Sequence, residues 1–379
     1  MQFTLTEEQE MTRIAARDFA QKELLPGVIE RDEKQIFPAE QIKKLGALGF
    51  LGMMTDPQYG GGGMDTISYV LVMEELSKID ASTSVVVSVN NSLVCFALEK
   101  YGTEEQKQKY LVPLARGEKI GAFCLSEPGS GSDATRQQTT AIDQGDYYLL
   151  NGTKNWITNG GTASTYLVFA QSDPSRGHKG INAFIVEKGM EGFSIGPKEN
   201  KMGIRASDTH SLHFSDVKVP KANRLGEEGA GFHYAMKTLE GGRIGIAAQA
   251  LGIASGAFEL AATYVKQRQA FGKPLSDHQA IRFKLADMAT GIEAARLLCL
   301  KAASLKDQGK SYKTAGSMAK LFASEVAMAV TVEAVQIHGG YGYVKEYHVE
   351  RLMRDAKITQ IYEGTSEIQK IIISREILK

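Results

Sequence analysis

The sequence of 379 residues contains few cysteines and carries no net charge, and both features exclude classes of function. Its three cysteines, Cys95, Cys124 and Cys299, stand far apart and form none of the close pairs that hold a metal or a redox disulfide. Lys and Arg total 44, as do Asp and Glu, so no overall field favours a nucleic acid partner. His210 and His213 lie on an expected strand and would face opposite sides, so no metal site is predicted.

Long apolar runs and an export signal are also missing. No run approaches the roughly 20 residues that a membrane-spanning helix needs, and the N-terminus lacks a basic segment followed by an apolar one. Thr6 and Gln9 instead have the spacing of a capping box, which predicts a helix start. We therefore expect a cytoplasmic protein that acts without a membrane partner.

Hydrophobic periodicity divides the chain into three regions. The pattern is helical in residues 1–120, consists of short β-type runs in 121–230, and is helical again in 231–379. Within the β region, Asn151-Gly152 predicts a tight turn. Helices, strands and helices in this order indicate an α+β fold rather than alternating βαβ units. The last region predicts long helices at about 238–269, 278–307, 312–338 and 366–378.

One carboxylate stands out near the C-terminus. In the segment 360–369, Glu363 lies between a tyrosine and a glycine, just before an expected helix. Ser366 and Gln369 have capping-box spacing, so this helix should begin at about residue 367. A loop carboxylate held by structure on both sides is well placed to meet a ligand, and Glu363 is therefore a candidate general base.

A second candidate site is the turn 123–133, where an expected strand runs into a stretch dense in Gly, Ser and Pro. Free backbone amides and hydroxyls there suit a phosphate-bearing ligand, although a glycine-rich hairpin without a ligand fits the same residues. Trp156, the only tryptophan, follows a further strand. A lone tryptophan is more often part of a core than a platform for a cofactor.

Two other stretches have both a structural and a functional interpretation. Arg268 and Gln279 flank a turn between long helices, where they suit either phosphate contact or simple exposure to solvent. Gly339 and Gly340 follow a helix, either as its cap or as a place where a ligand approaches the backbone. A nucleotide-binding Rossmann motif is rejected, because the nearest match has Tyr234 at the third glycine position and no βαβ unit around it.

Together and in this order, the motifs resemble those of the acyl-CoA dehydrogenases. They stand at 126–133, 268–272, 336–340 and 362–365, and the resemblance covers essentially the whole chain. It implies an N-terminal all-helical domain, a middle antiparallel β-barrel-like domain and a C-terminal four-helix bundle. It also implies a homotetramer, with FAD between the β domain and the last bundle.

The resemblance further implies which residues bind ligands. The FAD contacts would come from two parts of the β region, from the ends of the long helices on a neighbouring subunit, and from the C-terminal loop: Phe123, Leu125, Ser126, Gly131, Ser132, Trp156, Ile157, Thr158, Arg268, Phe271, Gln279, Gln336, Ile337, Gly339, Gly340, Thr365 and Glu367. The acyl-CoA substrate would contact Ser132, Glu240, Arg243 and Gly364.

By the same resemblance, Glu363 takes the α-proton of an acyl-CoA thioester while the β-hydrogen leaves as hydride to flavin N5. The product is a trans-2-enoyl-CoA, and the electrons pass to an electron-transferring flavoprotein. The developing enolate would be stabilised by the Glu363 N–H and a flavin ribityl hydroxyl. Burial raises the pKa of Glu363 and the nearby helix N-terminus lowers it; we expect desolvation by the bound substrate to dominate.

One position discriminates within the family. Isovaleryl- and long-chain members place the base on a helix, immediately before the arginine that matches Arg243, and here that position is Gly242. Glu240 points to another face of the helix, so Glu363 stays the base. The surrounding residues are most similar to short-chain (butyryl-CoA) or short/branched-chain (2-methyl) members. An acyl-CoA oxidase and a helical binding module without catalysis are the remaining alternatives.

Overall fold

The computed structural model describes residues 4–379 and begins with a helical region. Thr6 caps the first helix through the predicted capping box with Gln9. Three π-helical segments continue helices of this region: η1 (Ala20–Leu24), η3 (Val89–Cys95) and η4 (Lys107–Leu111). The α-helices are α1 (Glu7–Phe19), α2 (Val28–Lys34), α3 (Ala39–Ala47), α4 (Thr66–Ile79), α5 (Ala81–Ser88), α6 (Phe96–Tyr101), α7 (Glu104–Gln106) and α8 (Val112–Ala115).

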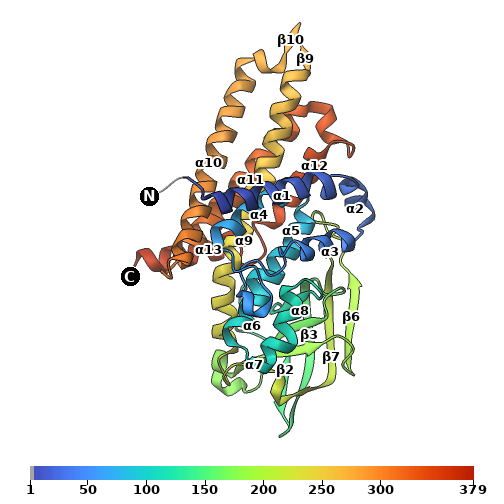
Figure 1. Ribbon diagram of the computed structural model, residues 1–379, viewed down its shortest axis with the longest axis vertical. Helices are drawn as coiled ribbons and strands as arrows, with labels where there is room; N and C mark the ends of the chain where they lie inside the picture. The colour runs from blue at the N-terminus through green and yellow to red at the C-terminus, as the bar shows by residue number, and fades with distance from the viewer. Residues whose placement is uncertain (1–3) are drawn as a thin grey trace.

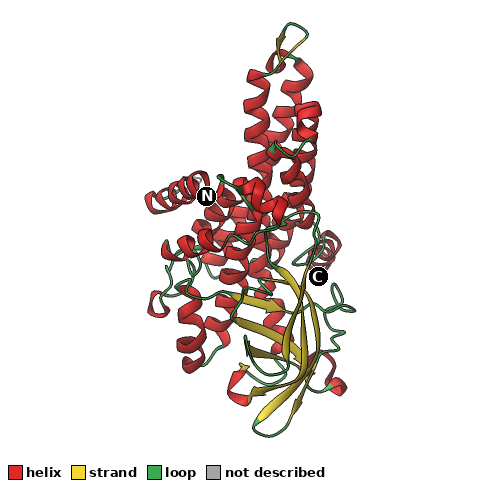
Figure 2. Ribbon diagram, turned by 90° about the vertical axis from the view of Figure 1, so that its right-hand side faces the viewer, coloured by secondary structure: helices red, strands yellow, loops and turns green. Residues whose placement is uncertain are grey.

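An eight-stranded sheet follows, in the order β6-β7-β3-β2-β4-β5-β8 with β1 beside β4. Its pairs are antiparallel except for the parallel contacts of β4 with β1 and β2. Figure 2 shows the sheet packed below the helices. The strands are β1 (Gly121–Cys124), β2 (Thr140–Asp143), β3 (Tyr147–Thr158), β4 (Thr165–Gln171), β5 (Ile181–Glu187), β6 (Phe193–Lys198), β7 (Thr209–Pro220) and β8 (Arg224–Leu225).

The turn predicted at Asn151-Gly152 is wrong, because both residues lie inside β3. Gly152 has a φ of 145° and sits at a register shift of the ladder with β7. A Cβ there would come within 2.7 Å of Thr139, so glycine serves close packing between strands rather than chain reversal. The chain reverses between β2 and β3 at Gly145, whose φ is 89°.

The C-terminal region contains α9 (Gly231–Gln267), α10 (Gln279–Asp307), α11 (Lys313–His338), α12 (His348–Ile358) and α13 (Ser366–Ile377). A short hairpin of β9 (Gln269–Ala270) and β10 (Lys273–Pro274) joins α9 to α10 at the end of the molecule opposite the sheet (Figure 1). Four of these helices were predicted and α12 was not. Its buried face combines the apolar residues Val349, Leu352 and Ala356 with the charged residues Arg351 and Asp355.

The two helical regions share one hydrophobic core, and the sheet has its own. Helix α9 packs against α4, α10, α11 and α12. Two helical stretches, Ala81–Tyr101 and Gly231–Gln267, have the length and composition of membrane spans but are 94% and 83% buried. The expectation of no such stretch was wrong: both stretches are helices of the protein core, in which small residues such as Gly252, whose Cβ would overlap α4, allow close packing.

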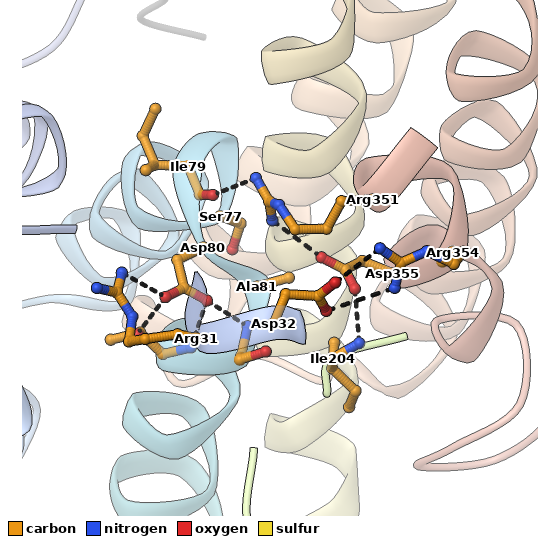
Figure 3. A network of polar contacts seen from close by, with 12 residues as sticks. Arg31, Asp32, Ser77, Ile79, Asp80, Ala81, Ile204, Arg351, Arg354 and Asp355 are labelled. Atoms are coloured by element: carbon orange, nitrogen blue, oxygen red, sulfur yellow. Dashed lines mark hydrogen bonds and ion pairs between the residues drawn. The ribbon is translucent and has the colours of Figure 1, made fainter. Parts of the chain in front are cut away.

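A buried network of charges connects three parts of the fold (Figure 3). Arg354 of α12 pairs with Asp32 of α2 at 2.7 Å. Asp355, the next residue, pairs with Arg351 at 3.1 Å and accepts the N–H of Ile204 from the β6–β7 loop at 2.5 Å. The network fixes α12, whose end leads directly into the loop that carries Glu363.

Candidate active site

Glu363 lies in the loop between α12 and α13, as predicted. Its φ is 51° and that of Gly364 is 95°, so the loop turns sharply through left-handed backbone conformations. The predicted cap is off by one residue: Thr365, not Ser366, caps α13, and its hydroxyl accepts the N–H of Ile368. The side chain of Gln369 does not close a capping box but turns back to the loop.

Side chains from three helices hold this loop. The carbonyl of Gly364 accepts hydrogen bonds from Lys320 Nζ of α11 at 2.7 Å and from Gln369 Nε2 of α13 at 2.9 Å. The hydroxyl of Tyr362 donates to Gln249 Oε1 of α9. A non-glycine residue at positive φ costs free energy, and these bonds offset it where Glu363 needs its geometry.

The carboxylate of Glu363 fills a space that α9 leaves open at Gly242. A Cβ built at Gly242 would overlap Glu363 Oε2 and come within 2.9 Å of Leu93. Oε2 is buried and has no hydrogen-bond partner among the described residues. A buried carboxylate oxygen without a protein partner is available to a ligand. A side chain at position 242, where the resemblance places the base of the isovaleryl- and long-chain members, would therefore occupy the same space as the carboxylate of Glu363.

Burial raises the pKa of Glu363 to about 7, against the opposing charges of Lys320 and Arg243. From the sequence, the helix N-terminus was expected to lower the pKa of Glu363. In the structure, the positive charges of Lys320 and Arg243 lower it. Desolvation already dominates in the protein alone. A carboxyl with a pKa near neutrality is suited to accept a proton at ordinary pH.

The two predicted substrate residues of α9 differ in surroundings. Arg243 is buried, its Nε has no hydrogen-bond partner among the described residues, and burial lowers its pKa. Glu240 forms an ion pair with Lys237 at 2.6 Å. Arg243 is thus available to a ligand beside Glu363, whereas Glu240 is engaged on the helix surface.

The β region brings a second set of predicted residues together. Trp156 lies two residues before the end of β3, with 62% of its surface exposed and a φ of 61°. The adjacent loop is tied to β3 because Asn155 N–H donates to the Ser126 carbonyl at 2.9 Å. Gly131 and Ser132 of that loop are exposed. The exposed indole answers the open question about Trp156: its ring is not part of the core.

The remaining residues of this set divide by burial. Phe123 packs against Phe169 in a tilted arrangement with ring centroids 4.8 Å apart, and Leu125 is buried. Ile157 is also buried, so only its backbone can face a ligand, while Thr158 is half-buried. The loop rests on a buried ion pair of Lys154 and Glu127 at 2.7 Å, which sequence reasoning did not single out.

A third set lines an open cavity of about 600 Å³ at the far end of the helices. Arg268, Ile337, Gly339 and Gly340 contribute to it, with Tyr264 stacked on His338. A Cβ at either glycine would meet no atom within 4 Å, so the backbone there is open to a ligand. Gln336 and Gln279 are exposed nearby in the chain, and Phe271 at the hairpin tip is 96% exposed.

The second and third sets do not meet within one chain. The strands with Trp156 lie at one end of the molecule and the β9–β10 hairpin beside Arg268 lies at the other (Figure 1). Thr365 and Glu367 lie at the start of α13, beside Glu363. Among residues 4–379 no cluster of His, Cys, Asp or Glu suits a metal ion.

Three family models match this chain along nearly its whole length. They describe the N-terminal, middle and C-terminal domains of acyl-CoA dehydrogenases and match residues 6–118, 122–217 and 229–378. The chain belongs to the acyl-CoA dehydrogenase family. It is an oxidoreductase with the α+β fold of that family, and the predicted fold class and family are confirmed.

Relatives of this acyl-CoA dehydrogenase include short-chain members. It is 54% identical over 379 residues to a short-chain specific acyl-CoA dehydrogenase of Clostridium acetobutylicum, with both chains covered completely. The structure of butyryl-CoA dehydrogenase from Megasphaera elsdenii is 53% identical with a TM-score of 0.98, and both chains are fully covered. A chain from a study of the electron transferring flavoprotein of Acidaminococcus fermentans is 55% identical, with a TM-score of 0.99 and full coverage of both.

FAD is the cofactor of acyl-CoA dehydrogenases, and the residues of this chain fit it. The exposed indole of Trp156 offers a flat surface to a planar ring. Arg268 and the open backbone at Gly339 and Gly340 suit phosphates. Glu363 Oε2 and Arg243 Nε have no hydrogen-bond partner among the described residues, so both are available to polar groups of a ligand.

Sequence reasoning missed the residues that hold the catalytic loop. Lys320, Gln249 and Gln369 are completely buried. The signal for Lys320 is present in the sequence: it stands among small residues of a long helix, on the same face as Gly316 and Ala323. A lysine on such a face needs a partner, and this was the available clue.

Proposed function

We propose that this protein catalyses the FAD-dependent α,β-dehydrogenation of short-chain acyl-CoA thioesters to trans-2-enoyl-CoA, with Glu363 as the base. The observation that carries the proposal is the buried, unpaired carboxylate oxygen of Glu363 in the volume opened by Gly242. The similarity to relatives named for short-chain substrates supports the substrate class.

Glu363 accepts the α-proton of the thioester. With a pKa raised to about 7 by burial, the carboxylate is a stronger base than an exposed glutamate, and the proton comes from a much weaker acid. The site must therefore stabilise the developing enolate. Among residues 4–379, the N–H of Glu363 donates to no protein acceptor, so it is available to the thioester carbonyl oxygen.

When bound, FAD supplies the acceptor for the hydride that leaves the β-carbon. Trp156, Thr158 and the loop around Ser126 would hold its ring, and Thr365 and Glu367 would contact it beside the base. Arg268, Phe271, Gln279 and the segment 336–340 would hold its phosphate and nucleotide part. Ser132, Arg243 and Gly364 would contact the acyl-CoA.

These assignments require a second copy of the chain. Strand β3, which carries Trp156, belongs to the sheet, whereas Arg268 lies beside the β9–β10 hairpin at the opposite end of the molecule, so we propose that the residues around one FAD come from different subunits. Helices α10 and α11 also expose large apolar side chains: Phe283, Leu297, Met318, Phe322 and Val332. Such faces suit burial against another copy, and we propose a homotetramer.

We propose an electron-transferring flavoprotein as the electron acceptor. The support is the close similarity to a chain from the study of such a flavoprotein. An acceptor protein distinguishes this proposal from an oxidase, which would produce peroxide in proportion to enoyl-CoA.

Steady-state rates across C4 to C16 and 2-methyl-branched acyl-CoAs test the substrate class. We expect the highest kcat/KM with butyryl-CoA, measured with an electron-transferring flavoprotein as the acceptor. A maximum at C12 or longer, or with 2-methylbutyryl-CoA, would contradict the short-chain assignment. Peroxide formed in a one-to-one ratio with enoyl-CoA, without any need for the flavoprotein, would contradict the acceptor.

A further inference from the structure

Lys320 is a buried lysine in the middle of α11. None of its surface is exposed, and neighbours on the buried face of α11 are small residues such as Gly316, Ala319 and Ala323. Burying an ammonium group costs free energy unless it gains compensating partners. A charge in this place therefore needs an explanation beyond packing.

The partner of Lys320 is the catalytic loop. Its Nζ donates to the carbonyl of Gly364 at 2.7 Å, the residue directly after Glu363. Among residues 4–379, no carboxylate lies within the 4.0 Å of an ion pair with Nζ. The lysine is thus held by a neutral carbonyl, and its charge acts on Glu363 without closing a salt bridge that would occupy the base.

We propose that Lys320 is a positioning residue for Glu363: it holds the sharp turn at Gly364 and its positive charge favours the ionised form of the base. The inference rests on the proposed role of Glu363. It adds a second function for α11, which otherwise serves the core and the cavity at the far end.

Other charged and titratable groups also face Glu363. Arg243 approaches from α9, Tyr69 from α4 and Tyr362 from the loop itself, and Glu367 of α13 interacts with Lys320. Of the two cations, Lys320 opposes the effect of burial on Glu363 more than Arg243 does. Burial lowers the pKa of Lys320 to about 8, against the attraction of Glu363, and this value stays above the pKa of about 7 of Glu363.

Two substitutions separate the two parts of this role. Lys320→Gln keeps a donor for the Gly364 carbonyl and removes the charge, whereas Lys320→Met removes both. In both FAD-bound variants we expect the acidic limb of kcat/KM against pH to move up by about one pH unit, because Glu363 binds its proton more tightly. Lys320→Met should in addition have a lower kcat/KM on the alkaline plateau. Lys320→Arg, which keeps the positive charge, should have its acidic limb at the wild-type pH.

Lys201→Met is the matched control. Lys201 is half-buried and, like Lys320, donates to a backbone carbonyl, that of Ser207 at 2.8 Å, but it lies between β6 and β7. The control should keep the wild-type pH profile. A profile of wild-type shape in Lys320→Gln and Lys320→Met, merely scaled in rate, would show a structural role only and overturn the inference.

Infrared difference spectra give a readout that does not depend on turnover. The carboxyl band that Glu363→Gln removes from the oxidised holoenzyme should persist to a pH about one unit higher in Lys320→Gln than in the wild type. An unchanged titration of this band overturns the inference. If instead Glu363→Gln keeps full turnover, the proposed base is wrong, which distinguishes the two failures.

Discussion

At the scale of single residues, the site depends on a small space beside α9 that either a Cβ at position 242 or the carboxylate of Glu363 can occupy, but not both. Gly242 has no Cβ, and a carboxylate oxygen of Glu363 occupies the space that a Cβ at this position would fill. Glycine in the middle of a helix costs about 1 kcal/mol relative to alanine, so this glycine lowers helix stability and makes room for the carboxylate that we propose as the base.

Gly242→Ala should therefore stabilise α9 locally and still reduce activity. The added Cβ displaces the carboxylate, and a misplacement of about 1 Å can cost on the order of 10²-fold in rate. Steady-state kinetics and the FAD content of the purified protein measure the effect. Gly241→Ala is the control, because a Cβ there has only the Ser92 carbonyl oxygen at 4.0 Å; equal losses in both variants would refute the shared-volume explanation.

Glu363 should also make stability depend on pH. Its pKa is raised from 4.5 to about 7, so the folded state binds the proton more tightly than the unfolded state does. Its contribution is fully present below pH 4.5 and is lost as pH rises to 7, by up to about 3 kcal/mol. Glu363→Gln removes this loss, so its Tm should exceed that of the wild type more at pH 8 than at pH 5. A difference that does not change with pH would contradict the raised pKa.

At the scale of elements, α12 leads into the loop that carries Glu363, and it is fixed both by the apolar residues Val349, Leu352 and Ala356 and by buried charges. Asp355 accepts from Arg351 and from the N–H of Ile204, and both Asp355 and Arg351 are buried. Removing one partner of a buried pair leaves the other charge without compensation.

Asp355→Ala should destabilise the protein by about 3 kcal/mol or more. Urea denaturation of the holoenzyme followed by circular dichroism measures the loss. Asp18→Ala breaks the exposed pair of Asp18 and Lys22 and should cost less than about 1 kcal/mol. Equal costs for the two variants would mean that the network does not hold α12.

Long elements were predictable from the sequence and irregular ones were not. The helices α10 and α11 lie within a residue or two of the predicted 278–307 and 312–338, because strong periodicity and clear terminators define them. The Asn151-Gly152 pair gave a wrong prediction of a turn, because a glycine that permits a turn also permits close contact between strands. Helix α12 was not predicted, although Val349, Leu352 and Ala356 form an apolar stripe on its buried face; the charged residues Arg351 and Asp355 share that face.

The candidate site shows the same division. Glu363 could be placed in its loop because the motif and the following helix start are local in sequence. The partners that fix the loop come from elsewhere: Gln249 on α9 and Lys320 on α11. Which helix faces meet depends on tertiary packing, and no pattern within either helix specifies it.

At the scale of the whole molecule, the sheet that contains β3 and the β9–β10 hairpin beside Arg268 lie at opposite ends. One complete site then combines Trp156 of one subunit with Arg268 of another. Subunits that are defective in different halves should complement each other, because some sites in a mixed oligomer receive two intact halves.

Co-expression of Trp156→Ala and Arg268→Ala chains tests this arrangement. Each variant alone should bind FAD weakly, and mixed oligomers should contain sites with wild-type affinity, seen as retained flavin absorbance after gel filtration. Mixing the two proteins after purification, without exchange of subunits, is the control. FAD content in the mixed oligomers equal to the average of the separate variants would show that each chain binds FAD alone.

The central claim is that Glu363 removes the α-proton of a short acyl-CoA. Anaerobic mixing of FAD-bound Glu363→Gln with butyryl-CoA, followed by flavin absorbance, tests it most directly. The account predicts yellow protein with normal FAD content whose flavin bleaches about 10²–10⁴-fold more slowly than that of the wild type. Bleaching at the wild-type rate would contradict it.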